Sequence, residues 1–319
     1  MKQVVGISVV RNESDVIEVF CRYNLNSLDE LHIIDNDSSD NTVKIIRYLI
    51  DEGLPIFLSH SHKKNHSQEK KLTEKMHELV RNRTDISYIV PLDADELILS
   101  KNKSDFVDDI SRIEIETKGI GCGNMYWESH IPECSVTSSI FYEQMSWVRK
   151  LPYIGLEMRK LVIPTYSHLN RCEISPGSHV LFDTVGQKTS LMHAVKLRTR
   201  LGHFPVRSYQ QIIRKIIMGG LALEMKGSPE WEGWHWKELS NLIRSQGFTL
   251  TVEQLREIAC FYSFKPQQAM NVQIINNPIF HFDNVVVKYE QSPIDVTNDL
   301  YLLTTFLISL VLDKNLLND

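Results

Sequence analysis

Three acidic side chains follow a short apolar run and have the types and spacing to bind a cation. The run covers residues 89–92, and Asp93, Asp95 and Glu96 come directly after it. Such a run is typical of a buried strand in a parallel sheet, and open α/β sheets bind ligands at the carboxyl ends of their strands. Asp93 and Asp95 are two residues apart, so they project to the same side of an extended chain. The pair offers oxygen ligands for Mg²⁺ or Mn²⁺, ions that proteins usually share with substrate phosphates; the alternative is an acidic turn exposed to solvent.

The segments before these acids alternate between strand and helix patterns. Apolar runs predict strands over residues 4–10, 31–34 and 56–58. Apolar residues at helical spacing predict helices over residues 16–23, 43–50 and 72–80. Asn12 or Ser14 is predicted to cap the first helix, and Asp40 or Thr42 the second. Strands and helices that alternate with short connections predict a parallel sheet with right-handed crossovers.

Polar residues follow the first and second predicted strands. Arg11, Asn12 and Glu13 follow the first, and Asp35 begins a polar segment after the second. Because the carboxyl ends of parallel strands meet at one edge of a sheet, these residues are predicted to lie beside the acids in a nucleotide-binding crevice. The alternative for residues 11–13 is the start of a helix with its cap.

Composition limits the class of protein. The 319 residues are 42% hydrophobic and 24% charged, which is typical of a soluble globular chain. The net charge of −5 argues against a nucleic-acid partner. Five widely spaced cysteines without a Cys-x-x-Cys pair, and no secretory leader or spanning run, predict a cytoplasmic protein. Neither Gly-x-Gly-x-x-Gly nor Gly-Lys-Ser/Thr follows a strand, which counts against dinucleotide and Walker-type sites.

The order and spacing of these motifs resemble glycosyltransferases of the GT-A fold, similar to glycosyltransferase family 2 and its relatives with an Asp-x-Asp-Glu signature. Residues 35–42 resemble the Asp-Asp-Gly-Ser-Thr-Asp-Gly-Thr motif of that group, with Asn36, Asp37 and Asn41 as departures. The resemblance implies an α/β fold of the GT-A (Rossmann-like) type, a mostly parallel sheet flanked by helices.

A later segment carries the resemblance further. Residues 202–208, which read Gly-His-Phe-Pro-Val-Arg-Ser, resemble the His-Tyr/Phe-Pro-x-Arg-Ser element of some relatives, and Lys215 follows. The sequence therefore predicts a nucleotide-sugar-binding and catalytic domain over residues 1–208. A helical region over residues 209–319 is predicted on the acceptor side or in oligomerisation.

In the family, a divalent ion bridges the two phosphates of the donor and stabilises the leaving group. The resemblance implies Mn²⁺ or Mg²⁺ bound by Asp95, with Asp93 on the ribose or on a metal-bound water. Glu96 either contacts the sugar or caps the next segment. His203 is the predicted further ligand, and His179 is an alternative ligand or a sugar contact.

The resemblance also implies contacts to the nucleotide sugar. Asp35 accepts hydrogen bonds from the base or the ribose, Lys71 offsets diphosphate charge, Gln68 contacts the donor sugar, and Arg207 pairs with phosphate through its fork of donors. The predicted donor-binding set is Arg11, Asn12, Glu13, Asp35, Gln68, Lys71, Asp93, His179 and Arg207.

An inverting transfer needs a base for the acceptor hydroxyl. The Glu-Asp pair that the family places before a helix is missing from residues 127–179. Glu157 is the predicted catalytic base, with four alternatives that the sequence does not rank: Glu128, Glu133, Glu143 and Glu173. The missing pair leaves the choice between inversion and retention open.

The carboxyl-terminal third offers acceptor-side candidates. Trp231, Trp234 and Trp236 either stack on sugar rings or pack helices together. The apolar residues in 300–312 form core or a homodimer contact, and peripheral attachment to the inner face of the membrane is the alternative.

The sequence thus predicts a metal-dependent glycosyltransferase of hexosyltransferase type. The donor is a nucleotide sugar, with a UDP-sugar favoured, and the acceptor is a glycan or a lipid-linked molecule in surface polysaccharide biosynthesis. One alternative is a sugar-nucleotide nucleotidyltransferase, which usually carries a glycine-rich loop that residues 11–14 lack. The other is a non-catalytic module that binds nucleotides or glycans.

Overall fold

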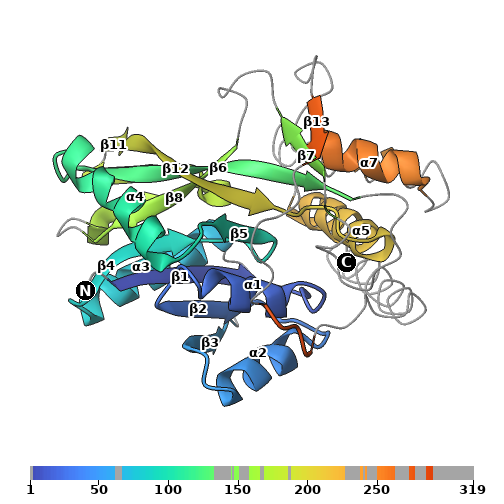
Figure 1. Cartoon of the computed structure of the whole chain (residues 1–319), viewed down its shortest axis with the longest axis horizontal. Coiled ribbons are helices and arrows are strands. Elements are labelled where there is room, and N and C mark those ends of the chain that lie inside the picture. Colours follow the sequence, from blue (N-terminus) through green and yellow to red (C-terminus); the bar gives the residue numbers. More distant parts are fainter. Residues whose placement is uncertain are drawn as a thin grey trace, which may run out of the picture.

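The computed structural model describes residues 3–61, 67–132, 145, 147–150, 158–165, 169–185, 188–226, 238–239, 241–242, 250–262, 273–276 and 285–289. In this part of the chain a ten-stranded mixed sheet is flanked by helices, and a three-stranded sheet packs beside helix α3 (Figure 1). The fold prediction of an α/β sheet flanked by helices is therefore confirmed.

The amino-terminal half forms the parallel part of the sheet. Its strands, in spatial order, are β3 (Ile56–His60), β2 (Glu30–Asp35), β1 (Gln3–Val10) and β4 (Ile86–Pro91). All three neighbouring pairs are parallel. The helices between these strands are α1 (Ile17–Asn24), α2 (Thr42–Asp51) and α3 (Gln68–Asn82).

Successive side chains of β1 face opposite layers, as the period of a strand requires. Val4 and Val10 join the apolar core formed with α1 and α2. Val5 and Ile7 join a second core formed with α3. Because both faces are covered, β1 is buried along nearly its whole length, which explains why it reads as a continuous apolar run.

In the second half of the sheet, later strands pair with the strands on either side of the acids. Helix α4 (Lys103–Glu116) separates β5 (Glu96–Leu99) from β6 (Gly121–Ile131). Strand β8 (Arg159–Pro164) is antiparallel to both β4 and β6. Strand β12 (His193–His203) pairs in parallel with β6 and antiparallel with β5. The pairing of β12 with β5 places His203 opposite Glu96.

The remaining elements lie at the margins of this sheet. Strands β7 (Trp147–Lys150) and β13 (Gln273–Asn276) extend it beyond β6. The three-stranded sheet consists of β9 (Cys172–Ile174), β10 (Leu181–Val185) and β11 (Lys188–Leu191). Two short 3-10 helices, η3 (Leu169–Arg171) and η4 (Pro176–Ser178), flank β9. The later helices are α5 (Tyr209–Lys226) and α7 (Val252–Phe261).

The predicted cap is wrong for α1, whose N-cap residue Val16 makes no side-chain hydrogen bond. At α2, the predicted residue Asp40 accepts a hydrogen bond through Oδ1 from the backbone N–H of Thr42, the first residue of the helix, at 2.9 Å. Asp40 also accepts one through Oδ2 from the backbone N–H of Ser14 at 3.2 Å. Thr42 accepts one from the backbone N–H of Glu13 at 2.8 Å. These bonds join the loop after β1 to the loop after β2, because the two strands end side by side.

The carboxyl-terminal predictions fall mostly outside the described residues. Trp231, Trp234, Trp236 and residues 300–312 all lie outside them. Within the described ranges, no helix has both the length and the apolar character needed to span a membrane.

Candidate functional site

The carboxyl ends of β1, β2 and β4 meet at one edge of the sheet. Val10 pairs with Asp35, and the backbone N–H of Asn36 donates to the carbonyl of Val10 at 2.9 Å. On the other side of β1, the N–H of Leu92 donates to the carbonyl of Ile7 at 2.9 Å. The polar segments that follow these three strands therefore share one edge, as predicted.

Asn12 holds the two nucleotide-side loops together. Its φ angle is +57°, a left-handed conformation that asparagine tolerates better than most residues. Its Oδ1 accepts hydrogen bonds from the backbone N–H groups of Ser39 at 2.7 Å and Asp40 at 3.3 Å. Its own N–H donates to Oγ of Ser38 at 3.0 Å. The predicted donor contact is thus also the residue that fixes the shape of this corner, while its neighbour Arg11 is exposed.

Asp35 and Lys71 stand at the end of β2. Asp35 is 4% exposed, and it accepts hydrogen bonds from the backbone N–H of Ser38 at 3.2 Å and from Nδ1 of His60 at 3.2 Å. The ammonium of Lys71 lies 2.5 Å from Oδ1 of Asn36, and burial lowers the pKa of Lys71. The structure therefore brings a carboxylate and an ammonium group together where the nucleotide was predicted.

The carboxylates of Asp93 and Glu96 share a buried lysine. Lys160, on β8, is fully buried, with Nζ 2.5 Å from Oδ2 of Asp93 and 3.3 Å from Oε2 of Glu96. The side chain of Gln68 donates to Oδ1 of Asp93 at 2.6 Å. Glu96 accepts from Nε1 of Trp127 at 2.6 Å and from the N–H of Asp93 at 2.8 Å. Every oxygen of the two carboxylates thus accepts at least one N–H donor.

Burial and charge act in opposite directions in this group. Burial raises the pKa of Glu96 to about 8, and Lys160 opposes that rise. Burial alone would lower the pKa of Lys160, but Asp93 and Glu96 outweigh it and the pKa rises. Glu96 was expected to contact the sugar or to cap the next segment. Both expectations are wrong, because Glu96 is fully buried and orients Trp127 and the turn that carries Asp93.

Asp95 faces two other cations. Its Oδ2 lies 2.6 Å from Nζ of Lys215, on α5, and 3.7 Å from Nη1 of Arg207. Arg207 also donates to Asp15 at 2.7 and 3.0 Å and to Glu13 at 2.7 Å. Burial would raise the pKa of Asp95, but Lys215 and Arg207 help to hold it well below its usual range. Burial raises the pKa of Glu13 to about 7, although Arg207 and Lys215 oppose the rise.

Arg207 is therefore placed differently from its predicted role. The residue is 3% exposed and its fork of donors is engaged by carboxylates, so it does not offer that fork to a phosphate. It ties the connection before α5 to the loop after β1. Because Lys215 on α5 also contacts Asp95, the helical region predicted from residue 209 takes part in the site.

His203 lies beside Asp95 but is closed off from solvent. The N–H of Phe204 donates to the carbonyl of Asp95 at 2.9 Å, and the ring of His203 stacks on Trp127 with 3.7 Å between centroids. Nδ1 of His203 is buried and has no hydrogen-bond partner in the described part of the chain. His179 directs Nδ1 at the carbonyl of Arg159, 2.6 Å away, so its ring is oriented by the backbone.

The predicted metal ligands Asp95 and His203 lie beside each other, but the acids at this edge already have ammonium or N–H partners. The described residues contain no group of three His, Cys, Asp or Glu side chains placed to hold a metal. The vacant Nδ1 of His203 suits an ion, but the predicted partner Asp95 already accepts the Lys215 ammonium. Proteins usually hold Mg²⁺ through one or two carboxylates, with phosphates and waters as the other ligands, and the oxygens of Asp93 here accept N–H groups from Gln68 and Lys160. The predicted metal-ligand pair therefore lies next to cations, without further ligands.

None of the five glutamates that were predicted as possible general bases is found facing the site in the part of the chain that the structure describes. Glu157, Glu133 and Glu143 lie outside the described residues. Glu128 follows Trp127 on β6 and so points to the other face, where its Oε1 is 3.8 Å from Nε2 of His130. Glu173 is exposed on β9, which belongs to the separate three-stranded sheet.

Sequence reasoning missed Lys160 and Trp127. Lys160 adjoins the apolar residues of β8, and a lysine within a buried strand is rarely found without a partner. That position was a usable signal. Trp127 carried no such signal, because its contact with Glu96 depends on the pairing of β6, β12 and β5.

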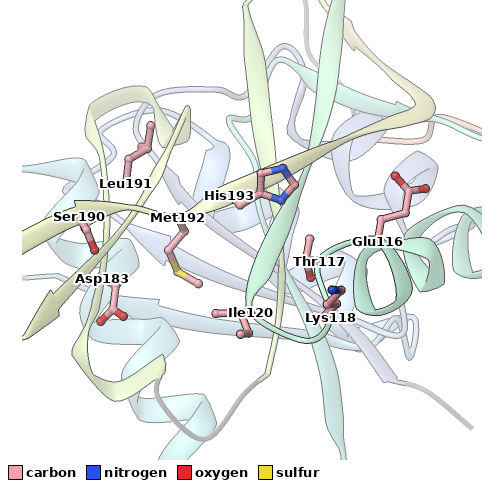
Figure 2. A pocket seen from close by; sticks show the side chains of 9 residues that line it. All are labelled: Glu116, Thr117, Lys118, Ile120, Asp183, Ser190, Leu191, Met192 and His193. Carbon is pink, nitrogen blue, oxygen red and sulfur yellow. The ribbon is translucent and has the colours of Figure 1, made fainter.

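A separate pocket lies away from these acids. Figure 2 shows nine side chains around it, among them Thr117, Met192 and His193. It adjoins the amino-terminal ends of β6 and β12, whereas Glu96 and His203 lie by their carboxyl ends. None of the predicted site residues lines this pocket.

No model of a protein family matches the sequence, and no curated protein matches it. Among solved structures, the chain is similar to residues 1–349 of TarS from S. aureus in complex with UDP, with 13% identity, 79% of this chain and 76% of that chain covered, and a TM-score of 0.36. It is also similar to glucosyl-3-phosphoglycerate synthase from Mycobacterium tuberculosis in complex with Mn²⁺, UDP and glucosyl-3-phosphoglycerate. That match has 16% identity, covers 40% of this chain and 44% of that chain, and has a TM-score of 0.28.

The chain spans less than half the length of the synthase. At these identities and TM-scores the likeness does not establish a function, so the function proposed for this chain depends on its own site.

Proposed function

We propose that this protein is a glycosyltransferase that takes its sugar from a nucleotide-sugar donor. One observation carries the proposal: a single sheet edge presents Asp35 at the end of β2, with Lys71 of α3 beside it, and, after β4, the acids Asp93 and Asp95 with the lysines that contact them. A carboxylate accepts hydrogen bonds from a nucleobase or a ribose, and ammonium groups offset the charge of a diphosphate. The edge thus offers a carboxylate for the nucleoside and ammonium groups for the diphosphate.

The transfer forms a bond between an acceptor oxygen and the anomeric carbon of the sugar. The bond from that carbon to the diphosphate oxygen breaks, and its electron pair leaves with the nucleoside diphosphate. Groups that are already oriented toward the developing charge lower the barrier most. Lys215 is the candidate for this role, because Asp95 fixes its ammonium group and its side chain is partly exposed, whereas Lys160 is fully buried between Asp93 and Glu96.

The finer predictions belong to the same proposal. UDP-sugars are the first donors to test, and a glycan or a lipid-linked molecule is the proposed acceptor, as the sequence resemblance implies. Hexosyl transfer with inversion is proposed on the same ground. Its base is proposed to be Glu157, and His179 is proposed to contact the sugar.

Calorimetric titration with UDP, GDP and CDP, followed by hydrolysis assays with a panel of nucleotide sugars, tests the proposal. We expect one nucleotide to bind and its sugar conjugate to be turned over. Asp35→Asn is expected to weaken that nucleotide by about tenfold, since a charged acceptor becomes a neutral amide. Asp51→Asn, at an exposed position on α2, is the matched control.

Two results would contradict the proposal. Binding of a nucleotide without turnover of any sugar conjugate would favour a non-catalytic binding module. Formation of a nucleotide sugar from a nucleoside triphosphate and a sugar phosphate would favour a nucleotidyltransferase.

A further inference from the structure

Two cations converge on one carboxylate beside the predicted diphosphate position. Lys215 lies in the second turn of α5, with Nζ 2.6 Å from Oδ2 of Asp95. Nη1 of Arg207 lies 3.7 Å from the same oxygen. Asp95 is 4% exposed, so water screens these charges little. We call Asp95, Arg207 and Lys215 the basic cluster.

The two cations differ in what they can reach. Arg207 is 3% exposed, and its guanidinium donates to Asp15 and Glu13. The Lys215 side chain is 26% exposed, and an ammonium has three donors. Of these three, the described residues show one engaged, by Asp95. Lys215 is therefore the member of the basic cluster that can contact a ligand, and Arg207 is a positioning residue.

Each acid of the Asp-x-Asp pair already contacts an ammonium group. A diphosphate that approaches bare carboxylates is repelled unless a cation lies between them, and a divalent ion usually supplies that charge. In this site Asp93 has Lys160 at 2.5 Å and Asp95 has Lys215 at 2.6 Å. Asp93 shares its lysine with Glu96, whereas Lys215 contacts Asp95, so both acids that were predicted to serve a divalent ion already have an ammonium partner.

We propose that the ammonium group of Lys215, held by Asp95 and backed by Arg207, binds the donor diphosphate and stabilises it as it leaves, in place of a divalent ion. The inference rests on the proposed function. As the bond between the anomeric carbon and the diphosphate oxygen breaks, the electron pair stays on that oxygen, and Lys215 donates N–H groups to the phosphate. In the net reaction the acceptor proton is released to solvent. Asp95 then acts by orienting Lys215.

The test begins with nucleotide binding to the full chain after exhaustive EDTA treatment, with residual metal checked by mass spectrometry. Using UDP as the probe, we expect calorimetry to give the same affinity with EDTA and with added Mn²⁺, within about twofold. Turnover of the donor identified by the nucleotide-sugar panel is expected to be equally insensitive to EDTA.

A set of variants identifies the residue responsible. Lys215→Met is expected to weaken UDP about 10- to 100-fold in EDTA, as for loss of a charge-assisted hydrogen bond, and added Mn²⁺ is expected not to restore it. Lys215→Arg is expected to recover part of the affinity. The matched control is Lys196→Met, which removes an exposed lysine 4.9 Å from the ring centroid of Tyr126 on β6.

Loss of folding is separated from loss of binding by a second variant. Lys215→Met leaves Asp95 buried without its ammonium, so thermal unfolding is measured for each protein. Asp95→Asn combined with Lys215→Met removes the unpaired charge and is expected to fold while binding UDP as weakly as the single variant.

Each outcome decides the matter. UDP binding that requires Mn²⁺, or wild-type affinity in a folded Lys215→Met variant, overturns the inference and leaves the proposed function standing. Failure of every nucleotide to bind, with and without Mn²⁺, overturns both.

Discussion

The ammonium nitrogen of Lys215 lies 2.6 Å from Oδ2 of Asp95, although 120 residues separate the two in the sequence. The contact joins helix α5 to the turn between β4 and β5. It neutralises an acid that is 4% exposed. The residue predicted to bind a metal is therefore also part of the packing between two regions of the chain.

Asp95→Ala is expected to reduce both activity and stability. Turnover should fall at least 100-fold if Lys215 loses its orientation. The free energy of unfolding should fall by about 2 kcal/mol, less than for a fully buried pair because Lys215 is 26% exposed. Urea unfolding of Asp95→Ala, Lys215→Met and the double variant measures the coupling. Additive losses would show that the pair contributes nothing.

Glu96 is expected to affect stability. Glu96→Ala leaves the indole N–H of Trp127 without its buried acceptor and removes one of the two carboxylates that contact Lys160, so a loss of about 1–3 kcal/mol is expected. Glu96→Gln keeps an acceptor and should lose less. Urea unfolding checks this, with Glu257→Gln at an exposed position of α7 as the control. Equal stability of Glu96→Ala and the control would show that this network is not needed.

Asn12 is expected to couple backbone geometry to nucleotide binding. Asn12→Ala combines a φ of +57° with loss of the acceptor for Ser39 and Asp40, so a loss of about 1–3 kcal/mol is expected. Asn12→Gly removes only the acceptor and should be milder. Thermal unfolding and UDP calorimetry measure the two effects. Asn26→Ala, in an exposed turn, serves as control.

Arg207→Lys is expected to be strongly destabilising despite the conserved charge. Lysine cannot reproduce the fork that donates to Asp15 and Glu13, and a loss of about 2 kcal/mol or more is expected at this buried site. The matched control is Arg171→Lys, where the same fork meets Asp183 on the surface with Arg171 47% exposed. Its loss should be at most about 1 kcal/mol. Similar losses in both variants would contradict this reasoning.

Stability is expected to depend on pH through His130. Burial lowers the pKa of His130 to about 4, against about 6.5 in an unfolded chain. Between these values the unfolded chain binds a proton that the folded chain does not, so the free energy of unfolding falls as the pH drops from about 6.5 to 4. The contribution is at most about 3 kcal/mol.

Unfolding of His130→Asn across this pH range provides the check. The variant should lack that part of the acid-induced loss, whereas His193→Asn, at an exposed position on β12, should retain it. An unchanged pH dependence in His130→Asn would exclude His130 as its source.

The sequence by itself determined the parallel sheet and the edge at which its polar residues meet. Apolar runs and helical spacing are local signals, and adjacent parallel strands end at the same edge, so Asn12, Asp35 and Asp93 could be placed together in advance. The tertiary structure alone decided what these residues face. Lys160 and Lys215 reach Asp93 and Asp95 through pairings across 67 and 120 residues. No local pattern encodes such distances, because they depend on how β8 and α5 pack against the strands that precede them.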